Sequence, residues 1–300
     1  MSMIRTQALT KRYGSTLALD SLNIELQQGE PIALIGPNGA GKTTLLSLLC
    51  GFIKASSGHV EILGHKAGSA QLSGKLAALP QDAVLDPRLS VGRQLRFFAR
   101  LQGISGKAAR VEVARVLETV DLQDSVKTRP TELSHGMRKR VAIAQALIGS
   151  PELVLLDEPT AGIDPPNAKM IRDLVREQSS NTTFIVSSHN LDELERLCSH
   201  VVYLEQGRLK SVGAITNDDS SHDVLTLRAP SIPAEPFIDQ CKGLGDVIEV
   251  TRTGQGDYLI KTDNDMAASV ELLRLLQQNN WRYRQLSRGK TLEERLYGND

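Results

Sequence analysis

The sequence predicts an α/β fold organised around a phosphate-binding site, and two stretches support this prediction. The apolar run 31–35 leads into the glycine-rich stretch GPNGAGKTT at residues 36–44, which a helical pattern of leucines follows. Further along, the run 153–156 is apolar without alternation and ends in two carboxylates. A run of that kind is typical of a central parallel strand with both faces buried. Ligands bind at the carboxyl ends of such strands, so both stretches indicate the same kind of site.

The glycine-rich stretch has the spacing G-x-x-x-x-G-K-S/T of a phosphate loop. Polyphosphate needs many donors at close range, so the loop must turn its backbone N–H groups inward, where side chains would block the approach. Lys42 offers a mobile cation to the β- and γ-phosphates, and the Thr43 hydroxyl is placed to bind Mg²⁺. The alternative is a tight strand-to-helix turn with chance glycines, but the flanking strand and helix favour a nucleoside triphosphate site. The residues expected around the phosphates are Gly36, Asn38, Gly39, Gly41, Lys42, Thr43 and Thr44.

The composition is that of an ordinary globular protein, and it argues against nucleic-acid binding and against a membrane span. Lys+Arg 35 against Asp+Glu 35 gives a net charge of zero, and aromatic residues make up 4%, so neither charge nor stacking favours nucleic-acid binding. Three widely spaced cysteines are expected to be reduced thiols in a cytoplasmic protein. No run reaches the roughly 18 apolar residues of a membrane span, and the N-terminus lacks a signal-peptide core, so we expect a soluble chain.

The first part of the chain is expected to be rich in strands. Strands are predicted at 3–9 and 17–26, joined by residues 10–14, and again at 58–63 and 76–79. Tyr13 would lie at a strand end, where an aromatic residue is more often a strand edge than a ligand contact. The last of these strands ends at Pro80 and Gln81, and a lone glutamine at a strand end indicates a surface residue.

A helical region follows. Apolar residues step by three and four between residues 89 and 122, and a further helix is expected to open at 131–136 and run to Leu147. The arginines among the first of these helices are interpreted as a solvated face or a docking face: Arg88, Arg93, Arg96 and Arg100.

The buried strand 153–156 presents Asp157 and Glu158 at its carboxyl end. Beside a phosphate loop this pair suits a metal and a water, with Asp157 holding Mg²⁺ and Glu158 orienting or deprotonating the attacking water. The alternative is a helix N-cap acid with a surface neighbour. A second strand, 182–186, ends near His189, and a strand-end histidine is commonly structural. A helix at 191–198 and a hairpin over 201–212 complete this part.

Beyond a polar linker at 216–221, the remaining segments follow the order β-α-β-β-α-β, which is typical of a ferredoxin-like unit. The expected strands are 224–227, 247–250, 258–260 and 281–286, with helices around 237–241 and 266–276 and a short terminal helix at 292–296. These residues contain no recognisable catalytic constellation.

The order of the motifs resembles that of the ATP-binding cassette (ABC) ATPases over about residues 2–214. The set comprises the phosphate loop, Gln81, LSHGM at 133–137, LVLLDEP at 153–159, AGID at 161–164 and His189. The resemblance implies an α/β phosphate-loop core at 1–214, with an antiparallel β subdomain and a helical subdomain at about 82–150. A small α+β accessory domain, ferredoxin-like in its segment order, would follow at 215–300.

The resemblance also implies roles for residues that are uninformative alone. Ser134 and Gly136 would contact the γ-phosphate bound by a second subunit, and Asp164 would cross that interface. Gln81 looks like the Mg²⁺ sensor that couples to a membrane partner. Glu158 matches the catalytic base and His189 the γ-phosphate switch, while Tyr13 looks like the aromatic that stacks on adenine. The signature motif departs from LSGGQ at His135 and Met137. These two replacements are expected to alter the contribution of the motif to the rate of ATP hydrolysis.

The implied function is that of an ATP-binding and ATP-hydrolysing subunit, with ATP and Mg²⁺ as cofactors. It would dimerise with a second ABC ATPase subunit and drive a separate transmembrane permease from the cytoplasmic face of the membrane. The C-terminal domain is similar to those of exporter subunits for drugs, antibiotics, polysaccharides or copper-enzyme maturation. Two alternatives stay open: a soluble ABC ATPase acting on nucleic acid or ribosomes, and a regulatory subunit that binds ATP with little turnover.

Overall fold

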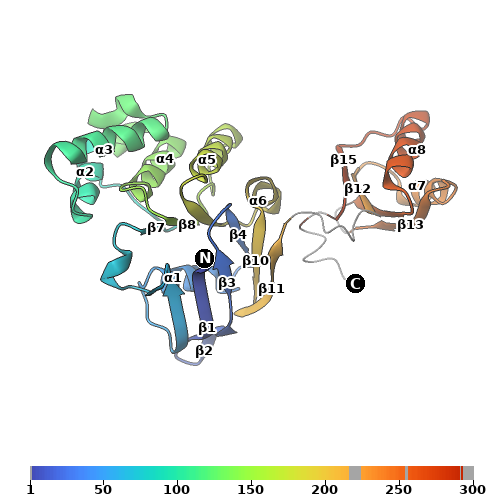
Figure 1. The fold of residues 1–300 in the computed structure, drawn as a ribbon. Helices are drawn as coiled ribbons and strands as arrows, with labels where there is room; N and C mark the ends of the chain where they lie inside the picture. The colour runs from blue at the N-terminus through green and yellow to red at the C-terminus, as the bar shows by residue number, and fades with distance from the viewer. Residues whose placement is uncertain (1, 216–223, 254–255, 291, 293–300) are drawn as a thin grey trace. The chain divides into compact units, whose positions relative to one another are not determined.

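The structure, a computed structural model, describes residues 2–215, 224–253, 256–290 and 292. The predicted linker 216–221 and most of the predicted terminal helix 292–296 lie outside the described residues. Contacts divide the chain into two compact units, Met1–Ala214 and Ile215–Asp300 (Figure 1). None of the described helices is both long and apolar enough to span a membrane.

The first unit contains a parallel sheet that carries the phosphate loop. Its strand order is β11-β10-β4-β9-β8-β7, and all pairs except the β10–β11 hairpin are parallel. The strands are β4 (Ile32–Ile35), β7 (Leu76–Leu79), β8 (Leu153–Asp157), β9 (Thr183–Ser187), β10 (His200–Glu205) and β11 (Arg208–Ala214). Every residue of β4, β8 and β9 is buried, which explains why these strands are apolar without alternation.

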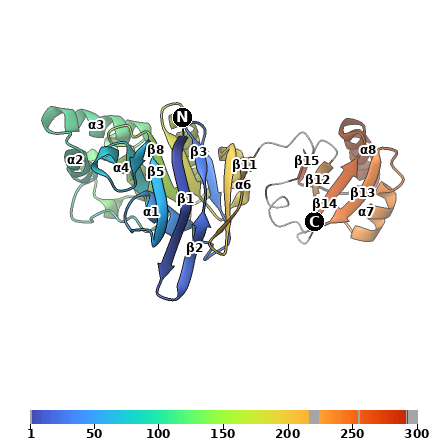
Figure 2. The same ribbon diagram turned by 60° about the horizontal axis from the view of Figure 1, so that its bottom comes forward.

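A second, antiparallel sheet lies on the other side of helix α1 (Lys42–Leu49) (Figure 2). Its strands are β1 (Ser2–Tyr13), β2 (Thr16–Leu22), β3 (Glu25–Gln27), β5 (Ser57–Ile62) and β6 (His65–Lys66). One core joins both sheets through α1, because Leu45, Leu46, Leu48 and Leu49 are all buried against them. The helix that starts at the phosphate loop is therefore fixed on both sides.

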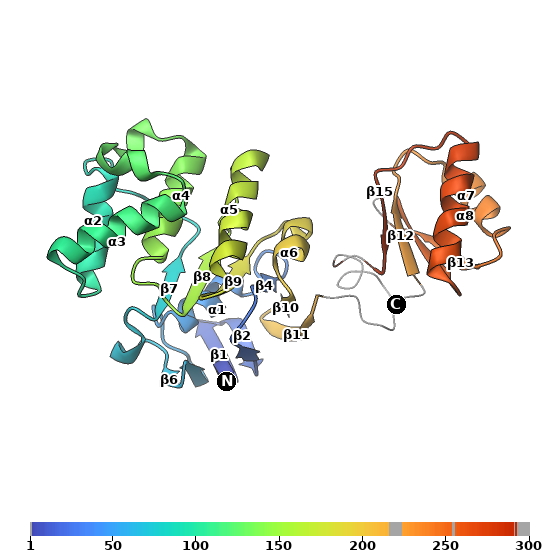
Figure 3. The same ribbon diagram turned by 45° about the horizontal axis from the view of Figure 1, so that its top comes forward.

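The remaining helices of the first unit form two groups. Helices α2 (Val91–Leu101), α3 (Gly106–Thr119) and α4 (His135–Ala146) gather into one cluster, and α5 (Pro165–Gln178) and α6 (Leu191–Leu197) lie together beside it (Figure 3). Short 3₁₀ turns lie at Ala70–Leu72, Gln123–Lys127 and Pro130–Glu132. The predicted helical region 89–122 is thus two helices, since Gly103 with φ 83° interrupts it.

The second unit is a four-stranded sheet of order β13-β14-β12-β15. Its elements are β12 (Val224–Arg228), α7 (Ala234–Cys241), β13 (Val247–Arg252), β14 (Asp257–Thr262), α8 (Asp265–Gln278) and β15 (Gln285–Arg288). This confirms the ferredoxin-like order β-α-β-β-α-β. Phe237, Tyr258 and Leu272 are fully buried in its own apolar core.

Three strand predictions were wrong in detail. Residues 10–13 continue β1 instead of turning. The predicted strand 17–26 breaks into β2 and β3 at residues 23–24, where the Asn23 side chain accepts a hydrogen bond from the Ala8 N–H. The predicted strand 281–286 begins only at Gln285, because Trp281 packs against Phe237, with 5.7 Å between ring centroids. In each case a tertiary contact or a local backbone feature overrides the apolar pattern.

Candidate nucleotide site

The phosphate loop connects β4 to α1, as the sequence predicts. Gly41 is the N-cap of α1 in a left-handed conformation (φ 102°), and no side chain caps this end of the helix. The first N–H groups of a helix have no partner within it, so the start of α1 presents uncapped donors and the positive end of the helix dipole. Such an end is suited to bind an anion.

Glycine is required at two loop positions by the neighbouring strands. A Cβ on Gly36 would lie 2.1 Å from the carbonyl oxygen of Leu204 on β10, and one on Gly41 would lie 2.5 Å from the side chain of Leu19 on β2. A Cβ on Gly39 would meet no atom within 4 Å. Packing therefore explains Gly36 and Gly41, whereas the positive φ of 80° at Gly39 is the feature that favours glycine there.

Lys42, Thr43 and Asp157 bring together the cation and the oxygen ligands expected from the sequence. The Lys42 ammonium donates to the carbonyl oxygens of Gly36 (2.6 Å) and Pro37 (3.2 Å). The Thr43 hydroxyl donates to Oδ2 of Asp157 at 3.1 Å, and the Ser187 hydroxyl donates to Oδ1 at 2.5 Å. The site thus pairs a lysine amine with an adjacent hydroxyl and carboxylate, a set that suits a phosphate-bound Mg²⁺, which takes few protein carboxylates.

Glu158 and His189 meet at the ends of two neighbouring parallel strands. Oε2 of Glu158 lies 2.9 Å from Nδ1 of His189. The Glu158 side chain is 12% exposed and that of His189 is 73% exposed. The Glu158 backbone has φ 49°, and its N–H donates to the carbonyl (3.2 Å) and hydroxyl (3.0 Å) oxygens of Ser187. Ser187 therefore fixes both Asp157 and Glu158, although nothing in the sequence motif singles it out.

Gln81 is exposed, and its backbone is held by a lysine that the motifs do not include. The ammonium of Lys139 on α4 donates to the Gln81 carbonyl oxygen at 2.9 Å. Burial lowers the pKa of Lys139, and the nearby charges of Asp82, Asp157 and Glu158 oppose this shift. The Lys139 ammonium therefore lies near these carboxylates. The sequence could not predict this contact, because a lysine within a helix is usually a surface residue.

The signature residues form a second group with the loop that follows Glu158. Ser134 is the N-cap of α4 and accepts a hydrogen bond from the Met137 N–H at 3.2 Å. Asp164 is the N-cap of α5, and its Oδ1 accepts from the N–H (3.1 Å) and the side-chain amide (2.6 Å) of Asn167. A Cβ on Gly136 would lie 2.4 Å from the Asn167 side chain. The structure therefore ties Gly136 to Asp164 through Asn167.

The structure thus arranges the predicted residues in separate places. One group comprises the loop 36–44, Asp157, Glu158 and His189, and another comprises Ser134, Gly136 and Asp164. Within the part of the chain that the structure describes, no hydrogen bond or ion pair joins these two groups. Tyr13 lies apart at the end of β1 with 49% exposure, and the Lys11 ammonium is 4.9 Å from its ring centroid.

Comparison with known proteins identifies the family. The model of the family described as "ABC transporter" matches residues 19–161. The linearmycin resistance ATP-binding protein LnrL of Bacillus subtilis is 32% identical over 254 residues, which cover 83% of this chain and 82% of that protein. The chain belongs to the ABC transporter family.

Other relatives and solved structures agree with this assignment. A Nod factor export ATP-binding protein I of Cupriavidus metallidurans is 32% identical over 82% of this chain and 80% of its own length. The bacitracin transport ATP-binding protein BcrA of Bacillus licheniformis is 38% identical over 69% of this chain and 68% of its own length. A solved ATP-binding subunit of an ABC transporter has a TM-score of 0.65 at 28% identity, covering 71% of this chain and 90% of that one.

The predicted family, fold class and enzyme class are therefore confirmed. ABC ATP-binding subunits bind ATP and are ATPases coupled to transport, and this chain is one of them. The alternative of a soluble ATPase acting on nucleic acid or ribosomes is not favoured, because the relatives named above are ATP-binding proteins of export, transport and resistance.

Proposed function

We propose that this ABC ATPase powers a separate transmembrane permease of an exporter, and that the contact between Glu158 and His189 beside the phosphate loop is its catalytic centre. The single observation that carries the proposal is the meeting of these two side chains at 2.9 Å, next to an Asp157 that already accepts from Thr43. Relatives named for Nod factor export, linearmycin resistance and bacitracin transport support the exporter assignment.

ATP would be bound by the loop 36–44, with its phosphates at the uncapped start of α1 and at Lys42. Tyr13 would stack on the adenine. Thr43, Asp157 and Gln81 would hold Mg²⁺, which when bound neutralises charge on the phosphate oxygens. For Lys42 this requires only that its ammonium exchange the carbonyls of Gly36 and Pro37 for phosphate oxygens.

In the reaction, the Glu158 carboxylate would orient the attacking water and accept its proton. Its carboxylate is held on one side by Nδ1 of His189, and its backbone by Ser187. His189, being 73% exposed, would present the rest of its ring towards the terminal phosphate. Hydrolysis would then yield ADP and inorganic phosphate, with water supplying the entering oxygen.

A second subunit is proposed to complete each site. Within one chain, Ser134 caps α4, and Gly136 approaches Asn167 of α5, which is hydrogen-bonded to Asp164. In the proposed dimer Ser134 and Gly136 would cover the nucleotide of the partner, with Asp164 at the interface. Residues 1–214 would be the nucleotide-binding domain, with a helical subdomain at about 82–150, and 215–300 an accessory domain. The dimer would lie on the cytoplasmic face of the membrane.

The substitution Glu158→Gln tests the catalytic centre. It keeps the size of the side chain but removes the base, so we expect retained ATP binding, a turnover reduced by roughly a hundredfold or more, and an ATP-dependent dimer on sizing. Asp173→Asn, on the exposed face of α5, is the matched control and should leave turnover unchanged. Equal rates for the wild type and Glu158→Gln would instead support a regulatory subunit with little turnover.

The partner is tested by purification of tagged Glu158→Gln protein from detergent-solubilised membranes with ATP and Mg²⁺. A polytopic membrane protein in comparable amount is the expected result. Recovery of ribosomes or nucleic acid instead would contradict the permease proposal.

A further inference from the structure

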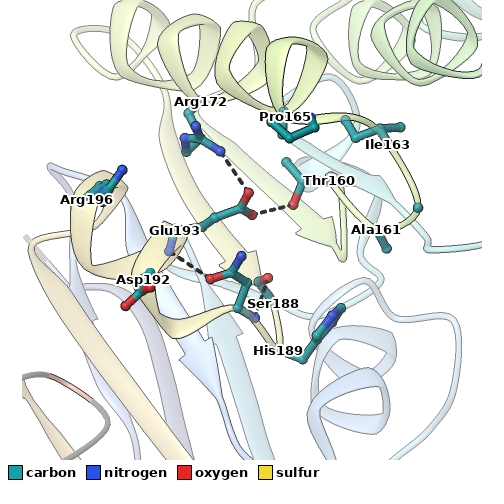
Figure 4. Close-up of a pocket in the computed structure, with 13 residues that line it drawn as sticks. Thr160, Ala161, Ile163, Pro165, Arg172, Ser188, His189, Asp192, Glu193 and Arg196 are labelled. Carbon is teal, nitrogen blue, oxygen red and sulfur yellow. Dashed lines mark hydrogen bonds and ion pairs between the residues drawn. The ribbon is translucent and has the colours of Figure 1, made fainter. Parts of the chain in front are cut away.

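Glu193 on α6 joins three segments that surround the catalytic centre. Its Oε2 accepts a hydrogen bond from the Thr160 hydroxyl at 2.8 Å, and its Oε1 accepts from the Arg172 guanidinium at 2.8 Å (Figure 4). The backbone N–H of Glu193 donates to Asn190, the N-cap of α6, at 3.2 Å. Both carboxylate oxygens are therefore occupied, by a residue of the loop after β8 and by a residue of α5.

These contacts lie beside a cleft of about 450 Å³ between that loop, α5 and α6. The side chains of Arg172 and Glu193 are 17% and 20% exposed, so their ion pair is partly shielded from solvent. A shielded pair with both oxygens hydrogen-bonded has a defined geometry, unlike a solvated pair at the surface. Because the cleft lies beside the loop, side-chain packing does not hold the loop on that side. The Thr160–Glu193 hydrogen bond supplies a restraint there.

Thr160 and Glu193 lie close in sequence to Glu158 and His189, so the bond between them can hold the two catalytic side chains in place. Thr160 follows Glu158 by two residues, and Glu193 follows His189 by four. The loop after β8 and the segment after β9 are therefore joined by two side-chain contacts, Glu158–His189 at 2.9 Å and Thr160–Glu193 at 2.8 Å. The first contact involves an exposed histidine, whereas the second is partly buried and anchored on Arg172.

We propose that Thr160 and Glu193 are positioning residues, which hold the loop of Glu158 in register with the segment of His189 so that these two side chains stay in contact. This inference rests on the catalytic role proposed for Glu158. A displacement of about 1 Å in a catalytic group can reduce a rate by up to roughly a hundredfold, so a lost restraint at this distance should be measurable in turnover.

The test uses Thr160→Val, which keeps the shape of the side chain and removes the hydroxyl, because removal of Glu193 would leave Arg172 as an unpaired, partly buried charge. We expect kcat to fall roughly tenfold, with KM and the calorimetric Kd for ATP changed by less than about twofold. Thr160→Ser restores the hydroxyl and should restore kcat. Thr119→Val is the matched control, since its hydroxyl donates only to a carbonyl within α3.

A readout on the nucleotide-free protein accompanies the kinetics. The nitrogen-15 NMR signal of the His189 ring, assigned by its loss in His189→Ala, should shift in Thr160→Val and not in Thr119→Val. An unchanged kcat in Thr160→Val would overturn the proposal. So would a fall in kcat that Thr160→Ser fails to restore, since that indicates a packing role. If Glu158→Gln itself leaves turnover intact, the catalytic assignment fails instead, and the two failures are thereby distinguished.

Discussion

At the scale of single residues, charge governs the site. Asp157 and Glu158 are buried carboxylates, and the Lys139 ammonium on α4 lies near them. A second ammonium, that of Lys42, lies on the phosphate loop, whose Thr43 donates to Asp157. The Lys42 ammonium donates to two carbonyl oxygens, which are uncharged acceptors, so its charge is available to a phosphate. Lys139 instead donates to the Gln81 carbonyl, so it links the signature helix to the segment that follows β7.

The contact of Lys139 leads to a prediction about the segment 80–83. Lys139→Met keeps the length of the side chain and removes the charged donor, which is worth about 1.5–3 kcal/mol in a typical charged hydrogen bond. The turn in which the Ala83 N–H donates to Pro80 should then open more often. We expect the Ala83 amide to exchange its hydrogen roughly tenfold faster or more. Lys169→Met, on the exposed face of α5, is the control; unchanged exchange at Ala83 would show that Lys139 does not restrain this turn.

The cysteines have no part in this chemistry. All three are free thiols, and burial raises the pKa of Cys50, Cys198 and Cys241 to about 12. The reactive species of cysteine is the thiolate, whose fraction at neutral pH is then very small. This agrees with the absence of any catalytic pattern around them in the sequence.

At the scale of elements, strand order places the catalytic groups. Strand β9 lies between β4, which leads into the phosphate loop, and β8, which ends in Asp157. Because these strands are parallel and fully buried, their carboxyl ends meet at one edge of the sheet. His189 and Glu158, which are 31 residues apart, become neighbours through this order.

The loop between β4 and α1 contains glycines for two different reasons, close packing at Gly36 and a positive φ at Gly39, and substitutions can separate them. Gly36→Ala places a Cβ against the backbone of Leu204 and should destabilise the fold by about 3 kcal/mol or more. Gly39→Ala meets no atom within 4 Å and costs only the strain of its positive φ of 80°, about 1 kcal/mol. Denaturant unfolding of both variants measures the difference. Equal losses of stability would contradict the packing argument for Gly36.

At the scale of the whole molecule, each of the two units has an apolar core of its own among the described residues. One lies around α1 in the first unit, and the other lies around Phe237 and Tyr258 in the second, where their ring centroids are 4.4 Å apart. The Tyr258 hydroxyl donates to the Ile232 carbonyl, so the polar atom of this buried ring has a partner. Each unit therefore has the buried surface that an independently stable domain requires.

The substitution Phe237→Ala tests this independence in the full-length chain. Loss of a buried phenyl ring should cost the second unit about 3–5 kcal/mol. We expect calorimetry to show one transition at a lower temperature and a second, belonging to the first unit, at the wild-type temperature, with ATP binding retained. Phe97→Ala, where the side chain is 56% exposed, is the control. A joint shift of both transitions would show that the two units unfold together.

The sequence by itself determined the parts of this protein whose chemistry requires a local pattern. The phosphate loop needs glycines, a lysine and a hydroxyl in a fixed spacing, and a central strand needs an unbroken apolar run before its carboxylates, so residues 36–44 and 153–158 could be interpreted without a structure. The ferredoxin-like order of the second unit likewise followed from local periodicity.

Only the tertiary structure decided which side chains support these motifs. Ser187 and Lys139 lie far along the chain from Asp157 and Gln81, which they contact, and Glu193 lies 33 residues from Thr160. Serine, lysine and glutamate at such positions are ordinary surface or strand-end residues. Their contacts depend on strand order and on the packing of α4 and α6 against the sheet. The physical reason is that a hydrogen bond between distant residues leaves no periodic trace in either segment, so it exists only once the sheet has brought them together.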